Sequence, residues 1–167
     1  IPSIVYGLFG GIFFVVTLKM QYSIIAGALT VAIIILPVII RTTEEALKTV
    51  PNEYREGSLA MGATKFQTLY KVILPSALPG ILSGVILSIG RVIGESAAVF
   101  LTAGTVASMP STIFDSARTL TVHSYLLTKE LGDISGAASV GIVLIIIVLF
   151  LNTIAKFIAK KLNKGNI

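Results

Sequence analysis

An arginine and a glutamate, Arg91 and Glu95, stand four residues apart inside an otherwise apolar run of this 167-residue chain. A charged side chain within a bilayer costs several kcal/mol unless it is paired or faces water. A spacing of four places both side chains on one face of a helix, where they can pair. Arginine also presents a rigid fork of donors that suits phosphate or carboxylate groups. The pair therefore indicates that Arg91 contacts an anionic solute, while Glu95 holds the arginine side chain and offsets its charge.

The helical face that carries this pair is otherwise small and weakly polar. It also holds Ala77, Gly80, Gly84, Ser88, Ala98 and Thr102. A structural interpretation competes with the solute contact, because glycines at GxxxG spacing let membrane helices approach closely. An interior ion pair adds little net stability over apolar packing. We therefore favour a solute pathway along this face, with a purely structural pair as the alternative.

Composition indicates the element that must position these residues, a membrane helix. Hydrophobic residues make up 54% of the chain and charged residues 13%, and the mean hydropathy is +0.94. Four runs approach or exceed the roughly 20 apolar residues that cross a bilayer. They are residues 2–18, 22–40, 76–103 and 137–158. We predict an all-α membrane protein, a polytopic helical bundle that forms a single transmembrane domain over residues 1–167. Because the first run begins at once and without Met, we expect the chain to be part of a longer protein.

Lys and Arg residues predict the orientation, since short loops rich in them stay on the cytoplasmic side. Segment 41–75 and the C-terminus together hold nine of these residues, whereas the loops on the opposite side of the membrane hold three. We therefore place segment 41–75 and the C-terminus in the cytoplasm, and segment 104–136 outside as a loop of short helices. The same bias explains the net charge of +5. It weakens a nucleic-acid interpretation, because the basic residues flank spans and form no stripe with interleaved aromatics.

Residues 51–75 predict two short helices joined by a tight turn. Gly62 is placed to stop the first helix, and Thr64 with Gln67 forms a capping box for a second helix that begins at Lys65 and ends before Pro75. Apolar residues gather about the turn and form a small knob rimmed by charge. Such a knob suits a groove on a partner, although an amphipathic hairpin lying on lipid headgroups fits the same features.

The spacing within this segment resembles the EAA motif of ABC-transporter permease subunits, which reads E-A-A, three residues, G, nine residues, I-x-L-P. Glu56, Gly57 and Ser58 occupy the first positions, Gly62 the glycine, and VILP at 72–75 the end. Two small residues replace the alanines and valine replaces the isoleucine. The resemblance implies a coupling helix that docks into a cytoplasmic ATPase. The implied docking residues are Glu56, Gly57, Ser58, Leu59, Ala60, Gly62, Ala63, Thr64 and Phe66.

Most of the chain is similar to the permease subunits of phosphate ABC importers. IPSIVYGLFG, LPVIIRTTEEALKTVP, LPGILSGVILSIGRVIGES and VLFLNTIAKFIAKKL resemble the PstA type, with the sister PstC type as the close alternative. In that family an R-x-x-G-E element, here Arg91, Gly94 and Glu95, is associated with phosphate translocation. The resemblance implies a substrate pathway of Arg91, Glu95, Ser88 and Gly94, and a full subunit of six spans in a prokaryotic plasma membrane.

The same resemblance implies the partners: a cytoplasmic ABC ATPase dimer, a second permease subunit and an extracytoplasmic phosphate-binding protein. We expect no cofactor on this chain, with ATP and Mg bound by the ATPase, because the sequence has no G-x-x-x-x-G-K-[ST] loop. We also expect no metal site and no catalytic residue, and we interpret the single His123 as an ordinary polar loop residue. The alternatives are an ABC importer for sulfate, molybdate or an amino acid, and an ATP-independent carrier or channel.

Overall fold

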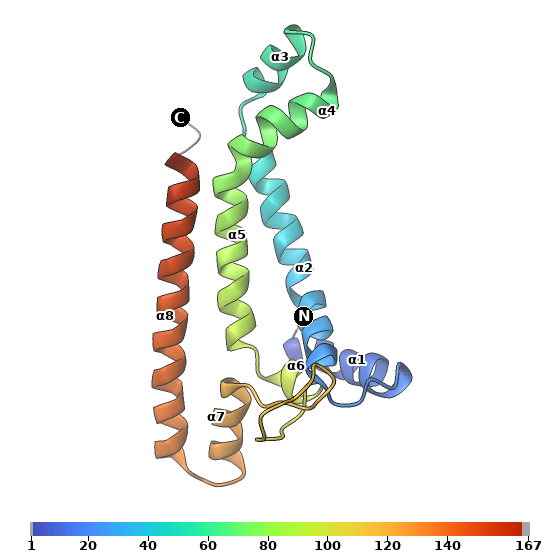
Figure 1. Cartoon of the computed structure of the whole chain (residues 1–167), viewed down its shortest axis with the longest axis vertical. Helices are drawn as coiled ribbons and strands as arrows, with labels where there is room; N and C mark the ends of the chain where they lie inside the picture. The colour runs from blue at the N-terminus through green and yellow to red at the C-terminus, as the bar shows by residue number, and fades with distance from the viewer. Residues whose placement is uncertain (1, 165–167) are drawn as a thin grey trace. The chain divides into compact units, whose positions relative to one another are not determined.

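The computed structural model describes residues 2–164, and their side chains as far as Phe157, and this part of the chain is helical without strands. Figure 1 shows the order of the elements. The bounds are α1 Ser3–Gly10, the π-helical turn η1 Gly11–Thr17, α2 Ile24–Lys48, α3 Asn52–Ala60, α4 Lys65–Thr68, the π-helical turn η2 Leu69–Ile73, α5 Leu74–Gly94, α6 Ala97–Phe100, α7 Leu120–Lys129 and α8 Ile134–Lys164. The expected all-α class is confirmed.

Three helices of the described part are long and apolar enough to cross a membrane: Ile24–Lys48, the continuous Lys65–Gly94 and Ile134–Phe157. The run at residues 2–18 gives the shorter apolar helix Ser3–Thr17 instead. The membrane helices keep apolar side chains at their surfaces, as in α8, where Ile142, Ile145 and Phe150 are at least 60% exposed. Lipid or further helices would cover such faces.

The expected span at 76–103 differs from the structure, because α5 ends at Gly94. Glycine favours a helix poorly, and the next residues form a break whose backbone is held from elsewhere. The Glu95 carbonyl oxygen accepts a hydrogen bond from the Thr121 hydroxyl at 3.0 Å. The Glu95 carboxylate accepts one from the Ala98 N–H at 3.3 Å, at the start of α6. One helical face therefore does not continue from α5 to Ala98 and Thr102.

The second hairpin helix also differs, because it does not end before Pro75. Residues Lys65–Gly94 form one continuous helix that passes through η2. Proline donates no backbone hydrogen bond, and a π-helical turn shifts the bonding pattern around the missing donor. The Ser76 hydroxyl donates to the Val72 carbonyl at 2.7 Å and so supplies an additional donor nearby. The helix thus continues past the proline at which we expected it to end.

The chain divides into two units, which are described separately. The first comprises Ile1–Leu36 and Gly90–Phe150. Its core gathers Val31, Val99, Ala103, Val122 and Leu126. Glycines allow close packing in this unit: a Cβ on Gly7 would lie 2.8 Å from the Ala98 Cα, and one on Gly27 would lie 2.8 Å from the Ala103 Cβ.

The second unit comprises Pro37–Ile89 and Leu151–Ile167. Its core gathers Ala46, Val50, Ile73 and Ala77. Here α2 and α5 pack through small residues, because a Cβ on Gly80 would lie 2.7 Å from the Ala46 Cβ and one on Gly84 would lie 2.2 Å from the Thr42 Oγ1. Gly80 and Gly84 therefore allow α5 to approach α2 closely, as the structural interpretation of their GxxxG spacing predicts.

Candidate functional site

The turn of the α3–α4 hairpin forms at Gly62, as the sequence predicts. Gly62 has a φ of +83°, which L-residues with a side chain rarely adopt. The Gly62 N–H donates to the Leu59 carbonyl at 2.9 Å, and the Ala63 N–H donates to the Ser58 carbonyl at 3.2 Å. These two bonds form a Schellman motif that satisfies the last carbonyls of α3.

The second arm begins with the predicted capping box. The Gln67 N–H donates to the Thr64 hydroxyl at 3.2 Å, and the Thr64 N–H donates to the Gln67 side chain at 2.9 Å. Both orphan donors are satisfied reciprocally. Each end of the four-residue linkage is therefore fixed, and the hairpin has a defined shape.

Two side-chain bonds hold the hairpin to itself and to α2. The Ser58 and Thr68 hydroxyls lie 3.0 Å apart, which joins α3 to α4. Arg55 donates through Nη2 to the Leu47 carbonyl at 2.9 Å, and so connects α3 to the last turn of α2. The Arg55 Nε is buried and has no protein partner in the described part. Both bonds lie within the second unit, and the bond from Arg55 fixes the hairpin relative to the end of α2.

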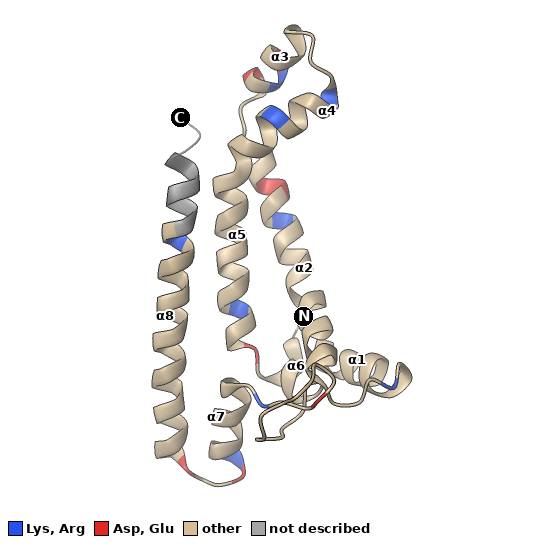
Figure 2. Cartoon of the chain, in the orientation of Figure 1, with Lys and Arg blue, Asp and Glu red and all other residues tan. Residues whose placement is uncertain are grey.

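The hairpin presents an exposed surface of mixed apolar and polar side chains. No residue of α3 is buried, and Met61 and Phe66 at the turn and in α4 are 89% and 69% exposed. The Phe66 and Tyr70 rings pack with centroids 4.6 Å apart. Figure 2 shows acidic and basic residues on α3 and basic residues on α4 and its continuation. Such an apolar knob with a charged rim can bury itself in a groove of another protein.

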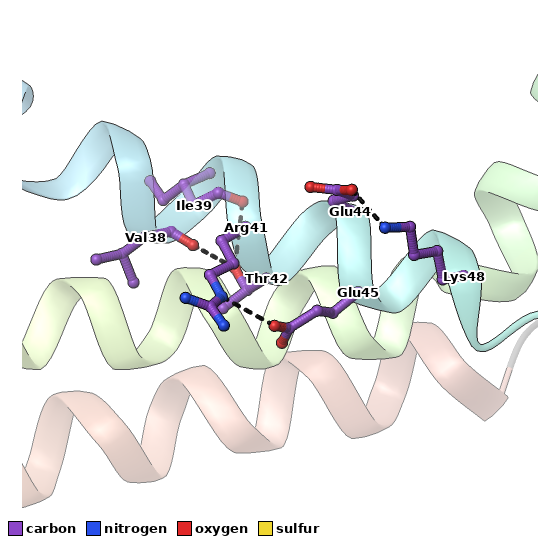
Figure 3. A network of polar contacts seen from close by, with 7 residues as sticks. All are labelled: Val38, Ile39, Arg41, Thr42, Glu44, Glu45 and Lys48. Atoms are coloured by element: carbon purple, nitrogen blue, oxygen red, sulfur yellow. Dashed lines mark hydrogen bonds and ion pairs between the residues drawn. The ribbon is translucent and has the colours of Figure 1, made fainter.

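Two exposed ion pairs lie along the last turns of α2, as Figure 3 shows. Arg41 donates to Glu45 at 3.1 Å, and Lys48 donates to Glu44. Exposed i,i+4 pairs contribute only about 0.3–0.5 kcal/mol each. The four charged side chains lie at this end of a long apolar helix and favour its contact with water or lipid headgroups.

The predicted ion pair of Arg91 and Glu95 is not formed. In the described residues the ion pairs are Arg41–Glu45 and Lys48–Glu44. The physical reason is the helix end at Gly94, since an i,i+4 pair requires a helix that continues through both residues. Glu95 instead bonds the Ala98 N–H, and Arg91 is exposed near the end of α5. Arg91 thus keeps its donors available.

The other two predicted pathway residues differ in their surroundings. Ser88 is 3% exposed, and its hydroxyl donates to the Gly84 carbonyl of its own helix at 2.9 Å. Gly94 is exposed, and a Cβ added there would meet nothing within 4 Å. The structure therefore gives Ser88 a packing environment and Gly94 an open one. Their part in a solute pathway stays a prediction.

The predicted loop of short helices at 104–136 contains α7, and its polar side chains brace the loop. Arg118 donates through Nε to the Thr105 carbonyl at 2.7 Å and through Nη1 to His123 Nδ1 at 3.0 Å. His123, which we expected in a loop, therefore lies in α7 and is hydrogen-bonded to Arg118. The backbone N–H groups of Thr112 and Ser111, each 2.8 Å from the carboxylate, lower the pKa of Asp115.

Sequence reasoning missed several residues of the hairpin. Arg55 and Thr68 fasten it, and Met61 is its most exposed apolar side chain. Met61 lies within the motif spacing, and its position at the turn could have indicated exposure. The roles of Arg55 and Thr68 depend on long-range bonds that no local pattern predicts.

An exposed helical hairpin between long apolar helices is the arrangement of a polytopic membrane protein. The chain belongs to the family of binding-protein-dependent transport system inner membrane components, whose model matches residues 1–166. No solved structure matches the chain significantly.

Curated relatives agree with this family. The chain is 38% identical to the probable ABC transporter permease protein YqgI of Bacillus subtilis, over 98% of this chain and 61% of the relative. It is 39% identical to the phosphate transport system permease protein PstA of Mycobacterium leprae, over 91% of this chain and 51% of that protein. The Mycoplasma pneumoniae homolog of PstA is 40% identical over 74% of this chain and 20% of its own length. The chain thus spans about half to three fifths of the first two relatives.

Proposed function

We propose that this chain is the translocating part of a permease subunit in an ATP-driven phosphate importer. The observation that carries the proposal is the exposed hairpin with EAA spacing, in a chain that belongs to an inner-membrane transport family. The phosphate in the proposal comes from relatives named as phosphate transport permeases. The complete importer would add a cytoplasmic ABC ATPase dimer, a second permease subunit and an extracytoplasmic phosphate-binding protein.

In this proposal the hairpin docks into the ATPase. The docking residues are those of the motif and its turn, with Met61 added for its exposure. ATP and Mg bind to the ATPase, and this chain supplies no hydrolytic group. The hairpin and the C-terminus face the cytoplasm of a prokaryote, in keeping with the distribution of Lys and Arg.

Arg91 is the proposed anion contact within the membrane. Its guanidinium is exposed and forms no ion pair in the described part of the chain. An anion passing beside it would gain charge-assisted hydrogen bonds. The Glu95 carboxylate is engaged by the Ala98 N–H, and it limits the net positive potential near the arginine, which prevents the anion from being trapped.

The test is reconstitution of the full-length protein with its ATPase, sister permease and binding protein in proteoliposomes. A panel of phosphate, sulfate, molybdate and an amino acid identifies the solute by ATP-dependent uptake. We expect phosphate uptake, a strong loss in Arg91→Ala, and impairment also in Arg91→Lys, because the planar fork is lost while the charge stays. Arg41→Ala is the control, since that exposed arginine forms its ion pair with Glu45 at the surface of α2.

A second candidate is the same machine with another solute, because YqgI is named as a permease without any solute. Uptake of sulfate, molybdate or an amino acid in place of phosphate would establish it. An ATP-independent carrier or channel would be favoured if the full-length protein bound no ABC ATPase after detergent extraction.

A further inference from the structure

A pocket of about 340 Å³ in the first unit is lined chiefly by hydroxyl side chains. It lies among the residues after α5, the helix α7 and the first half of α8, and Gly94 and Leu144 complete its lining. The polar lining residues are Ser96, Thr121, Ser124, Tyr125, Thr128 and Lys129. Arg91 does not line this pocket, which shares only Gly94 with the predicted substrate pathway.

Three of the hydroxyl groups have fixed orientations. Thr121 donates to the Glu95 carbonyl at 3.0 Å, Ser124 to the Ala137 carbonyl at 3.2 Å, and Thr128 to the Ser124 carbonyl at 3.1 Å. A hydroxyl carries one donor and two acceptor lone pairs. Because each proton is engaged by a carbonyl, these oxygens can offer the pocket only lone pairs. They are hydrogen-bond acceptors.

The remaining polar groups of the pocket are donors. Ser96, Tyr125 and Lys129 form no protein hydrogen bond through their side chains in the described part of the chain. The nearby carboxylates do not line the pocket: Glu95 accepts the Ala98 N–H, and Asp133 accepts the Gly136 N–H at 2.8 Å. Glu130 is exposed beside Lys129 and also lies outside the lining. The pocket thus holds one positive charge, two neutral donors and three acceptors.

We infer that this pocket binds a protonated oxyanion, and, resting on the proposed function, that the anion is phosphate on its way through the membrane. Phosphate at neutral pH carries both P–O⁻ acceptors and a P–OH donor. Lys129, Ser96 and Tyr125 donate to the oxygens, and the fixed hydroxyls accept the P–OH proton. Sulfate has no proton to give, so phosphate gains a hydrogen bond to the fixed hydroxyl oxygens that sulfate cannot form. A single ammonium with neutral donors binds the anion weakly enough to release it.

The first test measures the affinity of the purified full-length transporter for inorganic phosphate. The transporter is assembled with its ATPase and sister permease but without the binding protein. Ser96→Ala combined with Lys129→Gln should weaken phosphate binding about tenfold or more, since hydrogen bonds to a charged group are lost. Thr128→Val removes one acceptor and nearly keeps the shape of the side chain. It should lower the ratio of phosphate affinity to sulfate affinity by several-fold. The controls are Ser139→Ala and Lys19→Gln, whose residues are exposed and outside the pocket.

The same variants are then tested for uptake with the binding protein added. Phosphate uptake should fall in the double variant and remain within about twofold of wild type in the controls. If the double variant does not assemble, Tyr125→Phe serves in its place, because it removes one donor and keeps the ring contact with Phe100. The inference alone would be overturned if wild type transported phosphate but the double variant bound phosphate as tightly as wild type. The same holds for Tyr125→Phe where it replaces the double variant. Transport of another solute and not phosphate would overturn both it and the proposed function.

Discussion

Exchange of one methyl group between α5 and α2 tests the packing that supports the hairpin. A Cβ on Gly80 would lie 2.7 Å from the Ala46 Cβ and 3.5 Å from its Cα. Carbon atoms in good contact stand about 3.5–4.0 Å apart, so Gly80→Ala forces the two helices apart by on the order of 1 Å. Overpacking of this kind costs about 1–3 kcal/mol. We expect Gly80→Ala to lower stability by that amount.

The compensating change is Ala46→Gly, which removes the obstructing methyl group. In the double variant the nearest atom of residue 46 is the Cα, at the ordinary distance of 3.5 Å. Ala46→Gly alone should cost about 1 kcal/mol because glycine lowers helix propensity. The double variant should therefore be more stable than the sum of the two single changes predicts, by at least about 1 kcal/mol.

The assay is thermal unfolding of the assembled full-length transporter in detergent, run on wild type, both single variants and the double variant. Under the proposed function, phosphate uptake by the same four proteins shows whether the packing also positions the hairpin. Additive losses in the double variant would refute the direct Gly80–Ala46 contact. Wild-type stability in Gly80→Ala would refute it as well.

Three further predictions concern the hairpin and the loop between α6 and α7. Arg55→Met should reduce the ATP-dependent uptake several-fold while the ATPase still binds, because the Leu47 carbonyl loses its partner and the hairpin is less firmly held; Arg55→Lys should restore part of the uptake. Phe66→Ala should weaken ATPase binding in a pull-down by on the order of tenfold or more, since it removes an aromatic side chain that is 69% exposed, and unchanged binding would count against docking there. Asp115 has a folded-state pKa below its ordinary 3.8, so its stabilisation of the loop is present above that pH and is lost as the pH falls through the lower, folded value. In wild type, amide exchange at the Ser111 and Thr112 N–H groups should become faster as the pH falls through the folded-state pKa of Asp115. In Asp115→Asn this pH dependence should be absent.

The turn chemistry of the hairpin could be predicted from the sequence because it is local. Gly62 and the box of Thr64 with Gln67 act within a few residues of each other, and the structure confirms both. The course of the membrane helices could not be predicted in the same way. Pro75 and Gly94 are both helix-breaking residues by propensity, yet the helix continues through the first and ends at the second.

The difference between these two positions depends on the local backbone at the proline and on a long-range hydrogen bond at the glycine. A π-helical turn precedes the proline, whereas the Thr121 hydroxyl holds the Glu95 carbonyl just past the glycine. Thr121 is distant in sequence, and no local periodicity contains it. The predicted Arg91–Glu95 pair failed for this reason, since its spacing was sound only for a helix that continued.

The uninterrupted passage from α4 through η2 into α5 has a mechanical consequence. Between Lys65 and Ile89 the second unit contains no loop that could act as a swivel. Under the proposed function, a push from the ATPase on α4 is therefore delivered to the start of α5 through one continuous helix, as a tilt or an axial turn. The motion of the ATPase on nucleotide binding then reaches the membrane helix without passing through a loop.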